Sequence, residues 1–227
     1  MTAKQVVSKQ RVTDHGEVYT NPREVNAMLD LVKQETDRIE SKFLEPACGT
    51  GNFLVEVLSR KLAVVASRYA KSQLEYERYA VLAVSSLYGI DILIDNVAAC
   101  QNRLFDIFDT KYTELFKGKI SDKTSDECRA AVKYILKRNI IHGDALTLKT
   151  VGVVEGESPH PIVFSEWSPV NGSLLKRRDF VYGDLVMKSS ERDLPLFSDM
   201  GEEAYIPEPV KDFPLMHFLR VADADQL

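Results

Sequence analysis

The residues best suited to chemistry form one short segment, Glu45-Pro46-Ala47-Cys48-Gly49-Thr50-Gly51-Asn52-Phe53, between an expected strand and an expected helix. Its two glycines let the backbone pass close to a ligand, and the N-terminus of the following helix supplies oriented N–H groups. Glu45 could accept hydrogen bonds from an ammonium group. The segment lacks the lysine of a GxxxxGK[ST] phosphate loop, and only Gly49-x-Gly51 is present of a GxGxxG dinucleotide loop. The pattern therefore predicts a ligand-binding loop of neither kind.

Two further carboxylates and one upstream segment could complete such a site. Asp91 stands at the end of a second apolar stretch, where a carboxylate can bind the two hydroxyls of a ribose or can cap a helix. Asp144, in Gly143-Asp144-Ala145-Leu146, could accept a hydrogen bond from an adenine amino group or stabilise a turn. The segment His15–Pro22 lies ahead of these residues and ends in a Tyr-Thr-x-Pro turn.

The elements that must position these residues alternate between strand and helix. Three short apolar stretches read as strands, and each candidate carboxylate lies at the end of one of them. Such alternation predicts a parallel sheet covered by helices, with ligands at the carboxyl ends of the strands. The expected strands are Phe43-Leu44, Ser86–Asp91 and Ile140–His142, and the expected helices are Glu24–Val32 (capped by Asn21), Asn52 to about Arg78, Asp95–Phe108 and about Ser125–Lys137.

The sequence changes character after residue 150. A linker rich in Gly, Glu, Ser and Pro precedes the apolar run Ile162–Phe164, and Asn171-Gly172 is a strong signal for a two-residue hairpin turn. The hairpin would join strands Val163–Trp167 and Arg178–Tyr182. The acidic, proline-containing end of the chain is expected to wrap around the protein or to bind a partner.

Composition narrows the class of protein. The chain has 227 residues and a formal net charge of −5, which argues against a protein that wraps nucleic acid unaided. Three cysteines, an odd number without zinc spacing, predict a reduced cytoplasmic protein that holds no metal. No apolar run is long enough for a membrane span and no secretory signal is visible, so we expect no membrane partner.

Taken in order, these segments resemble the S-adenosylmethionine-dependent adenine-N6 DNA methyltransferases of bacterial restriction–modification systems. Glu45–Leu54 matches their first motif, (D/E)PACG(T/S)GNFL, nearly residue for residue. Tyr88–Ile92 is similar to the second motif, Ile140–Leu146 to the third, and Gly16–Val25 to an upstream motif that folds over the methionine end of the cofactor. The resemblance covers about residues 12–150.

The resemblance implies a Rossmann-like class I methyltransferase sheet with helices on both faces, incomplete without a partner and extended by a small β-hairpin. It divides the chain into an N-terminal arm and cofactor-capping segment (1–22), an S-adenosylmethionine-binding domain (23–150), and a hairpin extension with an acidic, partner-binding tail (151–227). Glu45 would hold the methionine amino group, Asp91 the ribose and Asp144 the exocyclic nitrogen of adenine. The other implied cofactor-binding residues are Tyr19, Thr20 and Pro22 on the methionine side, Pro46, Ala47, Cys48, Gly49, Thr50, Gly51, Asn52 and Phe53 in the loop, Ile92 against the adenine, and Ala145 and Leu146.

One part of the family pattern is missing. The fourth motif, (D/N/S)PP(Y/F), accepts hydrogens from the target nitrogen and stacks on the flipped base, and it occurs nowhere in this sequence. Glu166 and Trp167 are the only catalytic candidates in its place, and the predicted hairpin favours a packing role for Trp167. Lys176-Arg177-Arg178 could contact phosphates or form a solvated strand end.

We therefore expect the cofactor-binding subunit of a split, site-specific adenine DNA-methyltransferase that is inactive alone. A second subunit would supply the Asn-Pro-Pro-aromatic loop and most contacts with DNA. Two alternatives remain: a catalytically inactive regulatory or anti-restriction module, and a complete methyltransferase that acts on a small molecule or a protein.

Overall fold

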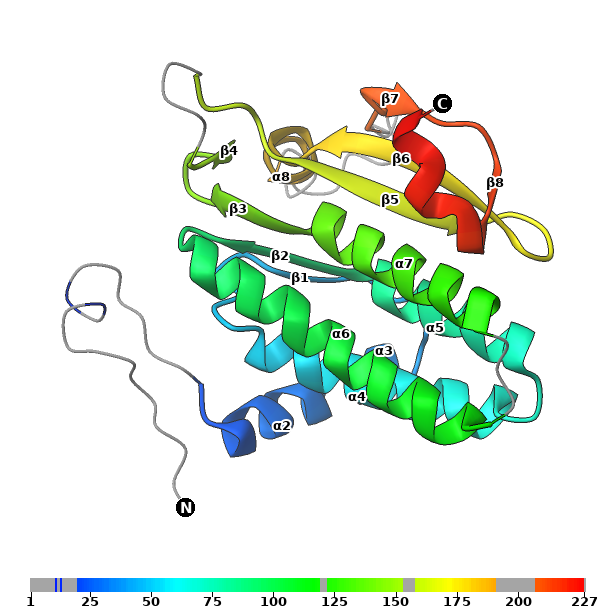
Figure 1. Cartoon of the computed structure of the whole chain (residues 1–227). Coiled ribbons are helices and arrows are strands. Elements are labelled where there is room, and N and C mark those ends of the chain that lie inside the picture. Colours follow the sequence, from blue (N-terminus) through cyan, green and yellow to red (C-terminus); the bar gives the residue numbers. More distant parts are fainter. Residues whose placement is uncertain are drawn as a thin grey trace, which may run out of the picture.

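The computed structural model describes residues 11, 13, 20–118, 122–152, 158–190 and 207–226, and it has a mixed α/β fold (Figure 1). Strands β1 (Phe43–Glu45), β2 (Leu87–Asp91) and β3 (Ile140–Asp144) are parallel, and β4 (Lys149–Thr150) pairs with β3 in the antiparallel sense. The order in this four-stranded sheet is β1-β2-β3-β4, so β1 forms one edge. The α/β class and the parallel pairing predicted from the alternating pattern are confirmed.

The helices follow the predicted order, with three differences: a short helix at 33–36 was not expected, the helix expected to end at Phe108 continues to Phe116, and one long helix is divided in two. They are α2 (Pro22–Leu31), α3 (Lys33–Thr36), α4 (Asn52–Tyr69), α5 (Gln73–Ser85), α6 (Ile94–Phe116) and α7 (Asp122–Asn139). The helix expected to run from Asn52 to Arg78 is in fact two helices. It ends at Tyr69, and Ser72 then caps α5 by accepting a hydrogen bond from the Glu75 N–H.

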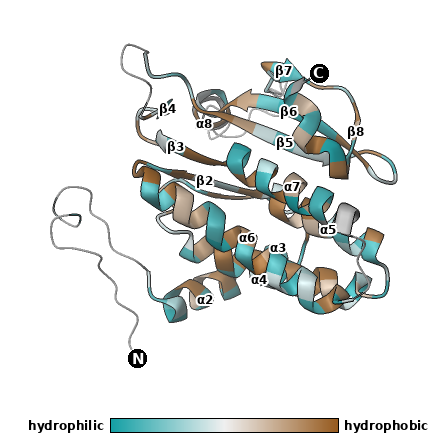
Figure 2. Cartoon of the chain, viewed as in Figure 1, coloured by the Kyte–Doolittle hydropathy of each residue, from teal (hydrophilic) through white to brown (hydrophobic). Residues whose placement is uncertain are grey.

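Helices and strands bury the two faces of the sheet differently. On one face, α4 and α6 pack over the strands through side chains such as Leu58 and Leu104, which are fully buried. Figure 2 shows hydrophobic and hydrophilic residues side by side on these helices, as expected for elements buried on one side only. On the other face, Tyr88 and Ile90 of β2 pack against residues that follow the linker, which are Ile162, Phe164 and Tyr182.

That second face is covered by the hairpin formed by β5 (Val163–Pro169) and β6 (Leu174–Val181), followed by α8 (Tyr182–Ser190). Among the described elements, α8 is therefore the one helix of the layer expected on that face. The predicted hairpin is confirmed, but its turn is longer than two residues, because Val170 and Leu174 are the last bonded pair before the turn. Gly172, within that turn, has a φ of 53°.

The end of the chain packs on the same body. Strands β7 (Lys211–Asp212) and β8 (Met216–His217) pair with β6, and the 3₁₀ helix η3 (Phe218–Gln226) lies against α7. Trp167, Phe218 and Val221 belong to the same hydrophobic core as α4 to α7. The core is therefore continuous across the predicted boundary at residue 151. Within the described part of the chain, no helix combines the length and apolar character needed to cross a membrane.

Arg177 of β6 is the central polar residue where the hairpin, α7 and η3 meet, and its side chain is 1% exposed. Its guanidinium donates to Asp179 Oδ2 at 2.8 Å, to Asp225 Oδ1 at 3.0 Å and to the Tyr134 hydroxyl at 2.6 Å. It also lies 3.9 Å from the centre of the Phe213 ring. The network joins the hairpin to α7 and to the end of the chain.

We expect Arg177→Met to lower the free energy of unfolding by about 3–5 kcal/mol, because Asp179 would remain buried without its cation. Lys176→Met is the matched control on the same strand. Its ion pair with Asp212 is largely exposed and should contribute about 1 kcal/mol or less. Urea unfolding of both variants measures the difference, and equal losses would contradict the assignment of Arg177 as the anchor.

Candidate functional site

The loop between β1 and α4 turns across the carboxyl end of β2. The Cys48 N–H donates to the Ile90 carbonyl at 2.9 Å, and the Gly51 N–H donates to the Cys48 carbonyl at 2.8 Å. Gly49 has a φ of 51° and Gly51 a φ of 85°, both in the left-handed region that favours glycine. The two glycines are therefore required by the backbone path of the loop itself.

Asp91, at the end of β2, holds this loop in place. Its carboxylate accepts hydrogen bonds from the Gly49 N–H (2.8 Å), the Leu93 N–H (2.9 Å) and the Asn96 side chain (3.2 Å). A carboxylate offers about four lone-pair sites, so the two-hydroxyl contact with a ribose predicted for Asp91 requires one of these donors to leave. In this structure Asp91 is 7% exposed and serves as the anchor of the loop.

The Glu45 carboxylate has different surroundings from the Asp91 carboxylate. It is half-buried at the carboxyl end of β1, and among the described residues no cation pairs with it. Burial raises the pKa of its carboxyl group. An ammonium group placed beside Glu45 would lower that pKa again and would gain a charge-assisted hydrogen bond. The residue is therefore suited to the role predicted for it.

A buried lysine of α4, Lys61, has a structural role at the other end of β1. Lys61 is fully buried and donates to the carbonyls of Ile39 and Ser41 and to the Ser86 hydroxyl. Burial lowers the pKa of Lys61 to about 7. Lys61 thus fixes the chain where it enters β1, and Glu45 stands where the chain leaves it.

Asp144 lies at the end of β3 in a local turn. It accepts hydrogen bonds from the Leu146 N–H at 2.9 Å and from the Thr147 hydroxyl at 3.0 Å, and these bonds lower the pKa of its carboxyl group. Ile92 is 45% exposed and Leu146 94% exposed. Ala145 instead packs against the hydrophobic residues between β2 and the hairpin, which include Ile90 and Ile162. His142 joins the ends of β2 and β3 through a 3.0 Å contact between Nε2 and the Ile92 carbonyl.

The upstream segment reaches the loop through Thr20. The Asn52 side chain donates to the Thr20 carbonyl at 3.2 Å, and Pro22 begins α2, whose N-cap is Asn21. The predicted residue Tyr19 lies outside the described residues. Arg11 forms a 2.6 Å ion pair with Asp95 and a 3.3 Å hydrogen bond to Asn96, so the N-terminal arm contacts the start of α6.

Three residues of α6 also belong to the site, although the sequence did not reveal this. They contact either the loop or Asp91, which anchors it. Asn96, Cys100 and Arg103 follow one another at helical spacing, so they share one face of α6. Asn96 binds Asp91, Arg103 binds Thr50 and Asn52, and Cys100 Sγ lies where a Cβ on Gly51 would come within 2.6 Å. Their spacing was a signal in the sequence, but nothing in it indicated which element that face would meet.

The two catalytic candidates on β5 lie elsewhere. Trp167 is 4% exposed, donates from Nε1 to the Asn139 side chain at 3.3 Å and packs edge-on against Tyr134. A ring in this position has no free face on which a base could stack. Glu166 forms ion pairs with Lys42 and with Arg178.

All three side chains of the basic cluster Lys176-Arg177-Arg178 form ion pairs with carboxylates of the chain. Lys176 pairs with Asp212, Arg177 with Asp179 and Asp225, and Arg178 with Glu166. The phosphate contacts considered for this cluster would therefore have to displace carboxylates of the chain itself.

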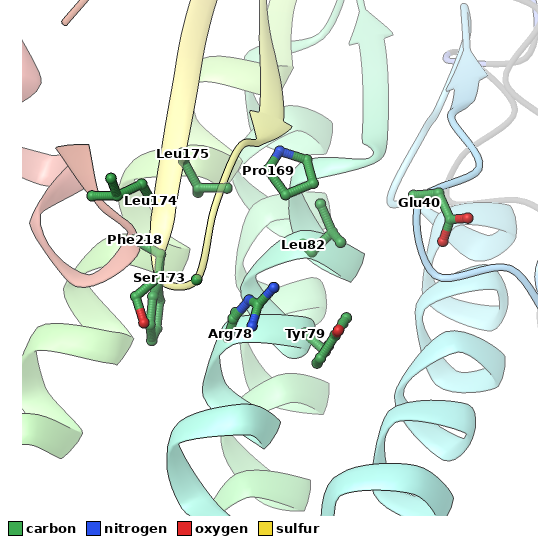
Figure 3. A pocket seen from close by; sticks show the side chains of 10 residues that line it. Glu40, Arg78, Tyr79, Leu82, Pro169, Ser173, Leu174, Leu175 and Phe218 are labelled. Atoms are coloured by element: carbon green, nitrogen blue, oxygen red, sulfur yellow. The ribbon is translucent and has the colours of Figure 1, made fainter. Parts of the chain in front are cut away.

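Two cavities lie away from the loop. A groove of about 510 Å³ runs along β1 and contains Leu44, Tyr88, Phe164 and Phe180, with the paired Lys42, Glu166 and Arg178 among its lining residues. A second cavity of about 320 Å³ lies between α5 and the hairpin turn. Figure 3 shows Arg78 and Tyr79 there, between the hairpin residues and Glu40. None of the predicted cofactor-binding residues lines either cavity.

Comparisons with protein-family models, with curated proteins and with solved structures returned no match to this chain. Within the described residues, no group of three or more His, Cys, Asp or Glu side chains could hold a metal ion. The site is thus defined by its own geometry, which brings together the glycine loop, the half-buried carboxylate of Glu45, and the ends of β2 and β3.

We expect Gly51→Ala to destabilise the protein through both backbone strain and a clash with Cys100 Sγ. Gly118 is the matched control, because its φ of 74° is also positive but nothing lies within 4 Å of a Cβ placed there. Gly118→Ala should cost about 1–2 kcal/mol, and Gly51→Ala about 1–3 kcal/mol more. In urea unfolding, Cys100→Ala should recover part of the extra loss, whereas two additive effects would show that the contact is unimportant.

Proposed function

We propose that this chain is the S-adenosylmethionine-binding subunit of an adenine-N6 DNA methyltransferase of a restriction–modification or related phage-defence system. In this proposal the sheet is the front part of a Rossmann-like class I methyltransferase fold and acts in the cytoplasm. The catalytic Asn-Pro-Pro-aromatic loop comes from a second subunit, which also makes most contacts with DNA. The observation that carries the proposal is the state of Glu45, a half-buried carboxylate that no cation of the described residues pairs with, beside a loop that is already formed.

The position of the motifs supports the same conclusion. The segment that resembles the first methyltransferase motif lies between β1 and α4, and the segments that resemble the second and third end β2 and β3. The carboxyl ends of the three parallel strands lie at the same end of the sheet, which is where α/β folds bind their ligands. This end lies toward the left of Figure 1, where α6 begins and β4 follows β3.

Each residue has a definite task in this proposal. Glu45 binds the amino group of the methionine moiety, and Ala47, Gly49 and Gly51 allow a close approach of the backbone. Asp91 keeps the loop in shape and has one lone-pair site left for a ribose hydroxyl. Asp144 and Ile92 are available for the adenine. The cofactor supplies the methyl group for the exocyclic nitrogen of a target adenine, and the residues of this chain orient the donor.

The positions of the two catalytic candidates on β5 support the need for a partner. Trp167 is buried and Glu166 is paired with two cations, so neither is placed to bind a flipped base. The edge strand β1 and the groove beside it offer the partner a place to continue the sheet. Leu44, which is 42% exposed, contributes to that groove.

Methyl transfer from labelled S-adenosylmethionine to mixed genomic DNA tests the assignment, first with this chain alone and then with the product of the neighbouring gene. We expect label in DNA only when both chains are present. Label with this chain alone would contradict the assignment of catalysis to a partner. Cofactor binding without transfer in either case would instead favour a regulatory or anti-restriction module.

We expect Glu45→Gln to weaken S-adenosylmethionine binding by about 10–100-fold, because a neutral amide replaces the carboxylate that faces the ammonium group. Glu40→Gln is the control, since Glu40 is exposed and lies before β1, beside the cavity in Figure 3. Isothermal titration of both variants measures the change. Similar affinities for Glu45→Gln and wild type would remove Glu45 from the site.

A further inference from the structure

Arg103 lies on the face of α6 that meets the glycine loop, and it joins parts of the chain that are far apart in sequence. Its Nη1 donates to the Thr50 carbonyl at 2.7 Å, to the Thr50 hydroxyl at 3.0 Å and to Asn52 Oδ1 at 2.8 Å. Thr50 belongs to the loop, and Asn52 is the first residue of α4. One guanidinium group therefore binds the loop and the start of the helix that follows it.

The contact extends to the upstream segment through Asn52. While Oδ1 of Asn52 accepts from Arg103, its Nδ2 donates to the Thr20 carbonyl at 3.2 Å. Arg103 thus fixes the orientation of the Asn52 amide, and that amide in turn binds the chain just before α2. Arg103, Asn52 and Thr20 form a continuous hydrogen-bonded path from α6 to the upstream segment.

This path is separate from the one centred on Asp91. Asn96, nearer the start of α6, binds Asp91 and so acts on the side of the loop next to β2. Arg103 acts on the side next to α4. The two halves of the loop are therefore held by different residues of the same helix, and they can be perturbed separately.

We propose that Arg103 is a positioning residue that holds the loop and the upstream segment together around the methionine half of the cofactor. The inference rests on the proposed function for the identity of the ligand, whereas the positioning itself concerns only this chain. A planar guanidinium suits this task because its donors have a fixed geometry, which a lysine ammonium lacks. Loss of Arg103 should then impair binding of the methionine half and leave the adenosine half unaffected.

Two probes separate the halves: S-adenosylmethionine, and 5′-methylthioadenosine, which lacks the amino-acid part. By isothermal titration of the full chain, we expect Arg103→Gln to weaken S-adenosylmethionine binding by about 10–100-fold. Binding of 5′-methylthioadenosine should change by no more than about twofold, and Arg103→Lys should recover only part of the loss. Equal weakening of both probes, or unchanged binding of S-adenosylmethionine, would overturn the proposal.

Hydrogen exchange of the unliganded chain provides a readout that does not depend on the ligand. We expect faster exchange in the peptide that contains residues 45–53 in Arg103→Gln than in wild type. Lys111→Gln is the matched control, because Lys111 also lies on α6 and donates to α4, at the Ser59 carbonyl, away from the loop. Unchanged exchange in Arg103→Gln would refute the positioning role, whereas faster exchange with no binding of either probe to wild type would refute the proposed function alone.

Discussion

The hydrogen bonds of the Asp91 carboxylate determine how the site is built. A backbone N–H turned into the protein needs an acceptor, and Asp91 provides one for Gly49 while also binding the Leu93 N–H and the Asn96 side chain. One side chain thereby connects the loop after β1, the end of β2 and the start of α6. The left-handed conformations of Gly49 and Gly51 and the close approach of Gly51 to Cys100 belong to the same arrangement.

The three carboxylates of the site have different roles in this arrangement. Asp91 and Asp144 are engaged with backbone and hydroxyl donors of their own chain, whereas Glu45 has no cation among the described residues. A ligand with an ammonium group would therefore gain most at Glu45. The Cys48 thiol is buried within the loop, where its hydrogen bond with Cys100 and burial both raise its pKa and favour the uncharged thiol.

Patterns within one element were readable from the sequence, and contacts between elements were not. The strands, the Asn21 cap and the hairpin at Asn171-Gly172 follow from local periodicity and turn chemistry. The break between α4 and α5 was missed because apolar residues continue on both sides of Ser72, and α5 is buried on most of its surface. Arg103 and Asn96 were missed because their role depends on which part of the chain α6 crosses. The packing of Trp167 was predicted because the hairpin placed it beside a strand partner.

In the proposed function, a partner is needed more for its chemistry than to cover the exposed edge of the sheet. β1 has only three residues, and a very short edge strand is itself a protection against unwanted pairing. Neither catalytic candidate on β5 offers an acceptor or an aromatic face for a flipped base, since Trp167 is buried and Glu166 is neutralised by Lys42 and Arg178. The second face of the sheet is also already covered by the hairpin. In the proposed function, we therefore expect a partner to approach along β1 and the adjoining groove, beside the strand that ends at Glu45.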